Sequence, residues 1–353
     1  MAKIKDVVAK NKPLSEKAKV DIALQALRDK REAKDSTIRL LQDRVVQLES
    51  ENKVFSAVRD LPPQIISIPP KVASTDSESI ACLVWSDWHI EETVVPEQVS
   101  NKNKYNLKIA DARFLSLLHG GLAWWRIAGR DTSIKTVILA LLGDFITGSI
   151  HEDLAEGNQL PPAEAIHKSY SMIVSGIKFM LKNTPKDVNF ILPCHSGNHG
   201  RMTKKQRIAT ESGNSLEYFM YRMLQDYFAE EKRVTFIVHP GYHSYVRCFD
   251  GKYNIRFHHG HQMNYQGGVG GISISVNKSI AQWNKSVPDI SLDVFGHFHT
   301  RFDGGNFICN GSMIGLTAYG VSIKASWEPP SQTFFLINKK YGAKTMVAPI
   351  FVS

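Results

Sequence analysis

Ile80-Ala81-Cys82-Leu83-Val84-Trp85 runs directly into Ser86-Asp87-Trp88-His89, and this stretch decides the fold. The apolar run is short and bounded by polar sequence, which predicts a buried strand that ends at a carboxylate and an imidazole. The same order recurs twice: the run 136–142 precedes Gly143-Asp144, and the run 189–192 precedes Gly197-Asn198-His199. Helical patterns fill the intervals at about 110–128 and 163–182. Strand, loop and helix in repetition predict an α/β fold.

Two hairpins are predicted nearer the C-terminus. Asp250-Gly251 joins the runs 242–249 and 252–258, and Tyr341-Gly342 joins the runs 333–338 and 343–352. Asp-Gly between alternating runs is a strong turn signal. Between the two, the glycine-rich segment 266–271 precedes a helical pattern. Its backbone amides could approach a phosphate, or it could be a mobile lid or a plain loop.

Ligand-type side chains also fill two later stretches, His259-Gly260-His261 and Gly296-His297-Phe298-His299. The donors in all five stretches are oxygens and imidazole nitrogens without cysteine, which suits divalent manganese, iron, zinc or magnesium, with manganese preferred. Seven such donors are too many for one tetrahedral centre, so the sequence predicts two ions that share a carboxylate. Asp144, in the middle of the set, is the expected shared ligand. A single such motif would carry little weight among 13 histidines, but the ordered set is hard to obtain by chance.

These five stretches resemble the signature of the calcineurin-like metallophosphoesterases, which runs D-x-H, G-D, G-N-H, H-G and G-H-x-H, over residues 79 to 320. The resemblance implies a four-layer αββα sandwich with two metal ions held on loops at one sheet edge. It implies a first metal held by Asp87, His89 and His299. It implies a second metal held by Asn198, His259 and His297, with Asp144 bridging the two.

The resemblance also implies a mechanism. His199 would lie beside the substrate phosphoryl group, to stabilise its charge or to protonate the leaving oxygen, and a hydroxide held between the two ions would be the nucleophile. Three neighbouring histidines fall outside the family motifs and are expected to have structural roles: His195, His258 and His261.

Two positions depart from the family pattern. Many relatives extend the second motif to G-D-x-x-D, but Thr147 occupies that last position here, so protein serine/threonine phosphatases are a poor match. Asp or Glu commonly follows G-N-H and can orient the histidine, but Gly200 follows here. The sequence leaves open which group orients His199.

The N-terminal region has a different pattern. A three-four repeat of apolar residues runs from Val20 to Phe55 and is interrupted by Arg31 and Lys34, and Asn52 takes a seam position. The pattern predicts an oligomerising coiled coil in which a buried asparagine would select the register. An amphipathic helix packed on the catalytic domain and a small DNA-binding module remain alternatives.

The predicted organisation has three parts. Residues 1–60 form the helical, coiled-coil segment, and residues 61–79, rich in proline and serine, form a linker because proline cannot continue a helix. Residues 80–353 form the catalytic domain. The apolar fraction of the whole chain, 43%, is normal for a protein with a globular core.

Composition also bears on location. The four cysteines are far apart without C-x-x-C spacing, which favours buried thiols in a reducing compartment over disulfides. No apolar stretch is long enough to cross a bilayer, and the N-terminus lacks a secretory signal. We therefore expect no membrane partner and a cytoplasmic protein, in the host cytoplasm if a phage encodes it.

Substrate identity is the least specified property. The net charge is +9, and a basic run follows the G-N-H motif: Arg201, Lys204, Lys205 and Arg207. This run could form a rim that attracts polyanions, or it could be a solvated loop. His151, seven residues after Asp144, could contact substrate or cap a helix.

The leading hypothesis is a metal-dependent phosphodiesterase that acts on nucleic acid. Its motifs are similar to those of SbcD-type nucleases and phage-encoded metallophosphoesterases, and both the basic run and the coiled coil would suit a DNA nuclease or exonuclease. One alternative is a phosphomonoesterase or small-nucleotide phosphodiesterase. Another is a non-catalytic oligomeric adaptor.

Overall fold

Two compact units make up the chain, residues 1–71 and residues 72–353. The structure, a computed structural model, describes residues 15–59, 77–150, 152–264 and 271–353. For residues 51–59 it describes the backbone only. His151, most of the predicted linker and most of the glycine-rich segment lie outside the described residues.

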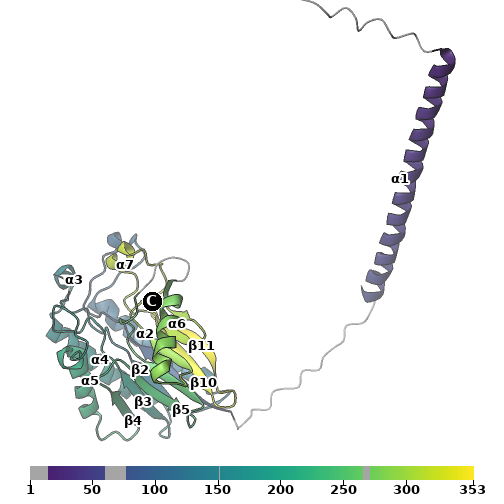
Figure 1. Cartoon of the computed structure of the whole chain (residues 1–353). Coiled ribbons are helices and arrows are strands. Elements are labelled where there is room, and N and C mark those ends of the chain that lie inside the picture. The colour runs from purple at the N-terminus through teal and green to yellow at the C-terminus, as the bar shows by residue number, and fades with distance from the viewer. Residues whose placement is uncertain (1–14, 60–76, 151, 265–270) are drawn as a thin grey trace, which may run out of the picture. The chain divides into compact units, whose positions relative to one another are not determined.

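Two sheets form the body of the second unit (Figure 1). The six-stranded sheet has the order β11-β10-β1-β2-β3-β4, and it consists of β1 (Glu78–Trp85), β2 (Ser133–Leu141), β3 (Asn189–Cys194), β4 (Val234–Val238), β10 (Ser331–Asn338) and β11 (Ala343–Phe351). The five-stranded sheet has the order β5-β6-β7-β9-β8, and it consists of β5 (Ser244–Cys248), β6 (Tyr253–Phe257), β7 (Leu292–Phe295), β8 (Phe302–Asp303) and β9 (Phe307–Cys309).

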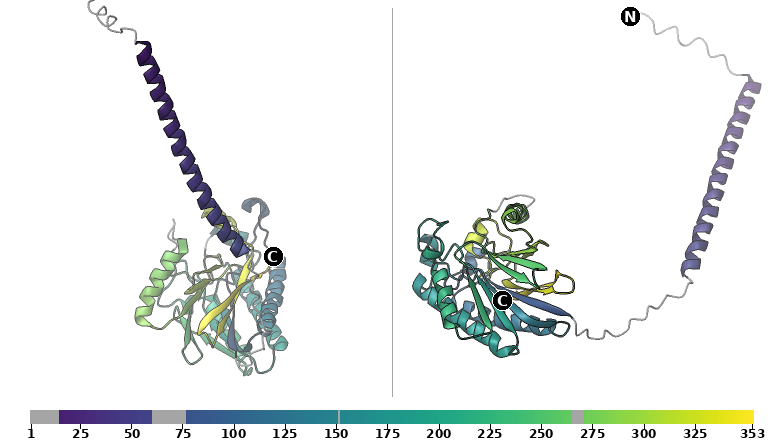
Figure 2. Two further views of the ribbon diagram at one scale, coloured as in Figure 1. Left: turned by 90° about the vertical axis from the view of Figure 1, so that its right-hand side faces the viewer. Right: turned by 60° about the horizontal axis from the view of Figure 1, so that its bottom comes forward.

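Helices cover the outer faces of both sheets (Figure 2). The six-stranded sheet is covered by α2 (Leu107–Ala128), α4 (Pro162–Asn183) and α5 (Leu216–Tyr227), and the five-stranded sheet by α6 (Gly271–Ser286). Two shorter helices lie in loops, α3 (Glu152–Gly157) and α7 (Ala318–Ser322).

Strand β1 shows why four layers form. Its side chains alternate between two apolar environments: Leu83 and Trp85 pack with the helices α2 and α4, whereas Cys82 and Val84 pack with the second sheet. A third cluster joins the outer face of the second sheet to α6 through Phe295 and Ile280, among others. Because both faces of β1 are buried, polar and apolar residues do not alternate along the strand, which explains its continuous apolar run. The predicted αββα sandwich is confirmed.

Most predicted elements are found within a few residues of their expected bounds. The first three runs form β1, β2 and β3, and the helical patterns form α2, α4 and α6. Both predicted hairpins are present, as β5 with β6 and β10 with β11, each antiparallel.

The first unit contains one helix, α1 (Glu16–Arg59), among its described residues. The apolar side chains of its predicted seam are about half exposed, for example Leu24 at 48% and Leu41 at 61%. The helix is therefore present, and self-association through its seam stays a prediction. The side chains of Asn52 and Phe55 lie outside the described residues.

Among the described residues, no helix has the length and apolar character of a membrane span. All four cysteines are buried and free, as expected of small apolar side chains in a core.

Candidate metal centre

The predicted ligands follow strands that end at the same side of the molecule. β1, β2 and β3 are parallel neighbours, so the loops that carry Asp87, Asp144 and Asn198 emerge at one sheet edge. β6 and β7 are parallel in the second sheet, and His259 and His297 follow them. Because the two sheets pack face to face, these two edges adjoin, and residues more than 200 positions apart meet there.

Motif glycines permit this close approach. A Cβ on Gly197 would lie 2.0 Å from Asp144 Oδ1, and one on Gly296 would lie 2.2 Å from Asp87 Oδ2. Any larger residue would push its loop away from the carboxylate that it faces. Glycine is therefore required in G-N-H and G-H-x-H because no side chain fits at these two positions.

Positive φ angles cluster at the predicted ligands. Five of the seven adopt φ between 48° and 69°, a region that non-glycine residues rarely enter: Asp87, His89, Asp144, His297 and His299. Such backbone strain costs free energy and is retained where the surroundings hold a functional geometry. This clustering therefore supports a functional site independently of residue type.

Three groups of donors lie with their ligand atoms within 4.8 Å of one another: Asp87, His89 and His299; Asp144, His259 and His297; and His89, Asp144 and His199. The first group is the set that the family resemblance assigns to the first metal, and the second contains His259 and His297 of the second-metal set together with Asp144, but not Asn198. Asp144 belongs to two of the groups, in agreement with a bridging position.

Contact distances within the groups are short. His89 Nε2 and His299 Nε2 approach to 3.2 Å, and His259 Nε2 lies 3.0 Å from Asp144 Oδ2. The Oδ1 atom of Asn198 is buried without a hydrogen-bond partner, as expected of an amide oxygen that serves as a ligand. The donor set therefore fits two divalent ions.

Neighbouring groups select the tautomers that a metal needs. His259 donates from Nδ1 to the Leu142 carbonyl oxygen at 2.6 Å, which leaves Nε2 for an ion. His89 lies with Nδ1 3.1 Å from the Thr147 hydroxyl, which itself donates to Glu92 at 3.0 Å, so that His89 Nε2 is likewise left for an ion.

Ionisation states agree with this assignment. Burial, assisted by neighbouring imidazoles, holds the pKa values of His89 and His297 well below their usual value, so both rings are neutral, the form that binds metals. Burial opposes the ionisation of Asp144, but the charges of His259 and His199 outweigh it and lower the pKa. Burial likewise opposes protonation of His259, but Asp144 raises its pKa to about 10. In the absence of a metal ion, a proton on His259 thus supplies the positive charge beside Asp144.

Thr147, the first departure from the family pattern, orients both histidines next to it. Its carbonyl oxygen accepts a hydrogen bond from His199 Nδ1 at 3.0 Å, and its hydroxyl faces His89. The backbone amides of Thr147 and Gly148 donate to Glu91, at 2.9 and 2.8 Å, which fixes the loop. The structure thereby answers which group orients His199.

Glu217 occupies the space created by the second departure. It is fully buried and accepts hydrogen bonds from the amides of Phe145 and Gly197, both at 2.7 Å, so it ties together two ligand loops. A Cβ at position 200 would lie 2.7 Å from its Cγ. Glu217 thus fills the space that a side chain after G-N-H would need.

Sequence reasoning missed Glu91, Glu92 and Glu217. The first two follow His89 closely, and an acidic pair directly after a ligand motif was an available signal. Glu217 has no local signal, since it lies on α5, eighteen residues after His199, and meets the site only through the fold.

The predicted substrate contacts are only partly close to the site. Arg201 turns back on its own loop and donates to the carbonyl oxygens of Asn198 and Thr203, at 2.7 and 3.2 Å. Lys204 and Lys205 are exposed. His195 Nε2 lies 2.8 Å from the Ser244 hydroxyl and His258 Nε2 lies 3.4 Å from Asp293 Oδ1, and a structural role for both stays a prediction. His151 lies outside the described residues.

No protein-family model matches the chain, and no curated protein sequence matches it significantly. Among solved structures, a predicted phosphoesterase from Streptococcus pneumoniae is 12% identical, with 74% of this chain and 83% of that one covered and a TM-score of 0.27. A dimetal phosphatase from Danio rerio is 10% identical, with coverages of 78% and 99% and a TM-score of 0.35. A putative 5′-nucleotidase from Staphylococcus aureus is 12% identical, with coverages of 78% and 55% and a TM-score of 0.28. At these TM-scores the likeness carries no argument about activity.

Proposed function

We propose that the protein is a phosphoesterase that depends on two divalent metal ions. The observation that carries the proposal is the convergence of six of the seven predicted donors, from four loops of two sheets, with strained backbone at five of them. The seventh, Asn198, has a buried amide oxygen without a hydrogen-bond partner. A structural site for a single ion would need only four donors.

Each ligand has a role in this proposal. Asp87, His89 and His299 would hold one ion, Asn198, His259 and His297 the other, and Asp144 would bridge them. When bound, the two ions would lower the pKa of water and neutralise charge on the phosphoryl group.

His199 is the proposed catalytic side chain. Its Nδ1 proton is held by the Thr147 carbonyl oxygen, so Nε2 is the atom available to the substrate. Burial lowers the pKa of His199, although the charge of Asp144 opposes this shift. Protonation of the leaving oxygen would require a second proton on Nε2, and the negative charge of Asp144 would stabilise that proton.

Nucleic acid is the proposed substrate class. The support is the net charge of +9 and the exposed side chains of Lys204 and Lys205 in the loop that follows His199. Cationic side chains beside a phosphoesterase site concentrate polyanions and release counterions on binding.

Hydrolysis of two substrates by one preparation tests both the proposed phosphoesterase activity and the proposed nucleic-acid substrate. Purified protein with Mn²⁺ is given end-labelled linear DNA and, separately, p-nitrophenyl phosphate, with EDTA and Asp144→Ala as controls. Cleavage of DNA by the metal-loaded wild type alone supports a nuclease. Intact DNA with release of p-nitrophenolate means a small-substrate phosphatase, and no hydrolysis of either favours a non-catalytic adaptor.

A salt titration tests the basic loop. Replacing both Lys204 and Lys205 by alanine should weaken DNA binding and lower the slope of log K against log salt by about 2, since each lysine neutralises roughly one phosphate. The matched control replaces Lys182 and Lys186, exposed lysines at the opposite end of β3. Equal effects of the two pairs would show that the loop has no special role.

A further inference from the structure

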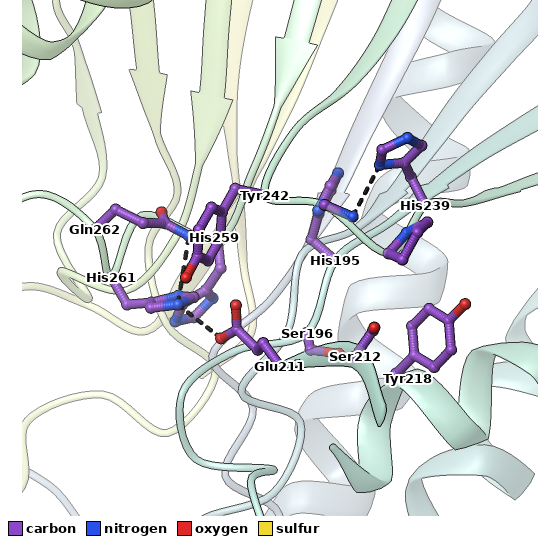
Figure 3. Close-up of a pocket in the computed structure, with 12 residues that line it drawn as sticks. His195, Ser196, Glu211, Ser212, Tyr218, His239, Tyr242, His259, His261 and Gln262 are labelled. Atoms are coloured by element: carbon purple, nitrogen blue, oxygen red, sulfur yellow. Dashed lines mark hydrogen bonds and ion pairs between the residues drawn. The ribbon is translucent and has the colours of Figure 1, made fainter. Parts of the chain in front are cut away.

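The surroundings of the metal centre differ in the room that they offer a substrate. On the side of His259, the pocket in Figure 3 has a volume of only ≈ 20 Å³, which is room for about one water molecule. Glu211 and His261 pair within it at 2.9 Å. A substrate larger than its phosphate is therefore expected to extend elsewhere, and the chain beside Asp87 and His299 is exposed.

Residues 315–327 form this exposed segment. Just before it, the backbone amide of Met313 donates to the Asp87 carbonyl oxygen at 3.0 Å. Just after it, the Glu328 carboxylate accepts a hydrogen bond from the backbone amide of Arg301 at 2.8 Å, and Arg301 is two residues from His299. Both ends of the segment are thus tied to loops that carry donors of the first group.

Aromatic and aliphatic side chains of this segment face solvent. Tyr319 is 65% exposed and Trp327 is 46% exposed, and between them Val321 and Ile323 are also exposed. The amide of Ile323 donates to the Tyr319 carbonyl oxygen at 3.1 Å, so these two side chains, four residues apart, lie on one side of α7. Large apolar side chains gathered at the surface are typical of an interaction site.

Lysines give this surface its charge. Trp327 Nε1 donates to the Lys102 carbonyl oxygen at 3.2 Å, which joins the segment to residues 100–104. Neither stretch contains Asp or Glu, and together they contribute three exposed lysines: Lys102, Lys104 and Lys324. One exposed acid, Glu97, lies just before the first stretch. We call these three lysines, with Tyr319, Val321, Ile323 and Trp327, the Trp327 surface.

We propose that the Trp327 surface binds unpaired bases of a nucleic acid whose phosphate is hydrolysed at the metal centre. Exposed aromatic rings stack on bases of any sequence, and lysines beside them attract the phosphates of the strand. The bases of a duplex are stacked on one another, so the two rings reach them only where a strand is unpaired. The inference rests on the proposed function and adds to it a preference for single strands.

Binding of DNA that resists hydrolysis tests the inference apart from catalysis. The full-length protein with Mn²⁺ is titrated into fluorescent phosphorothioate oligothymidylate and, separately, into its duplex with oligoadenylate, and anisotropy gives each Kd. Tyr319→Ala and Trp327→Ala should each weaken binding of the single strand by about tenfold, the effect of one lost stacked base, and change duplex binding less.

Salt dependence separates stacking from charge. Because stacking releases no counterions, Tyr319→Ala should keep the wild-type slope of log K against log salt, whereas Lys324→Ala should lower that slope by about 0.7 for a single strand. The matched control is Tyr341→Ala, which should keep the wild-type Kd. Tyr341 is 67% exposed and follows β10, which is antiparallel to β1, so it lies at the sheet edge away from the metal centre.

A melting curve identifies an aromatic variant that fails to fold, and the other variant then carries the test. The inference is overturned if both variants bind the single strand as tightly as the wild type does, or if they lose single strand and duplex equally, and the phosphoesterase proposal then stands. Sedimentation of the wild type but not of Tyr319→Ala with phosphatidylserine vesicles would assign the surface to a membrane instead. If the wild type binds neither DNA, the inference fails together with the proposed nucleic-acid substrate.

Discussion

At the scale of residues, both departures from the family pattern have a local explanation. Thr147 holds His199 through a backbone carbonyl oxygen, an atom that every residue type has, so no side chain at that position reveals the role in a sequence. Gly200 leaves room for Glu217, which reaches the site from a distant helix. The candidate donors could be named from the sequence because each follows a strand in a short motif, and their role as ligands stays a prediction. The groups that orient them could not, because they depend on tertiary contacts.

Substitution of Gly200 tests whether Glu217 restricts the space at this position. In Gly200→Ala, the new Cβ would lie 2.7 Å from Glu217 Cγ, and Glu217 cannot move easily because two amides hold its carboxylate. We expect a loss of roughly 1–3 kcal/mol in the free energy of unfolding, the usual cost of overpacking, together with reduced hydrolysis. Denaturant unfolding measures the first quantity.

Gly157→Ala is the control, since nothing lies within 4 Å of the corresponding Cβ. Equal stability of the two variants would show that Glu217 does not constrain this position.

At the scale of elements, local pattern was enough to predict β1 to β3 and their helices, because continuous apolar strands and amphipathic helices are signals contained within each segment. It did not predict α5 or β4, nor that β6 pairs with β7 in parallel. That pairing joins segments separated by the whole of α6, and contacts of that range leave no periodicity in either strand.

A buried polar cluster joins β5, β6 and β7 to α6, and it should make the protein sensitive to acid. His243 contacts Trp283 with ring centroids 4.5 Å apart, and burial, with help from His258 and Arg256, lowers its pKa to about 3. In the unfolded chain His243 takes up a proton near pH 6.5, whereas in the folded chain it stays neutral until about pH 3. The stability that depends on neutral His243 is therefore fully present above pH 6.5 and is lost as the pH falls toward 3.

We therefore expect His243→Phe, which keeps an aromatic ring against Trp283, to lose less stability on acidification than the wild type. The difference should be roughly 3 kcal/mol at pH 4 relative to pH 7. Unfolding in urea at both pH values gives the number. If the wild type and His243→Phe lose the same free energy of unfolding between pH 7 and pH 4, the folded protein does not resist protonation of His243.

At the scale of the whole molecule, the open question is what covers α1. Seam residues from Val20 to Leu48 are exposed in the single chain, and apolar side chains at heptad spacing are typical of helices that pair. We infer that a second copy of the chain covers this seam.

Leu41→Asp, in the seam, should convert an oligomer to a monomer, because a buried carboxylate in a coiled-coil core is strongly unfavourable. Leu40→Asp is the matched control, since Leu40 is 68% exposed and lies outside the seam. Light scattering coupled to size exclusion gives the mass of each full-length protein. A monomeric wild type would refute self-association through α1.

Two ions that share the site through Asp144 are the core of the proposed function, and the metal content of the protein shows whether both bind. Wild type and Asp144→Asn are dialysed against Mn²⁺, and bound manganese per chain is measured by elemental analysis, with a melting curve for each protein. We expect two equivalents in the wild type and one or fewer in the variant, because Asp144 lies in two of the donor groups. A wild type that binds no manganese, or a folded variant that keeps two equivalents, would contradict it.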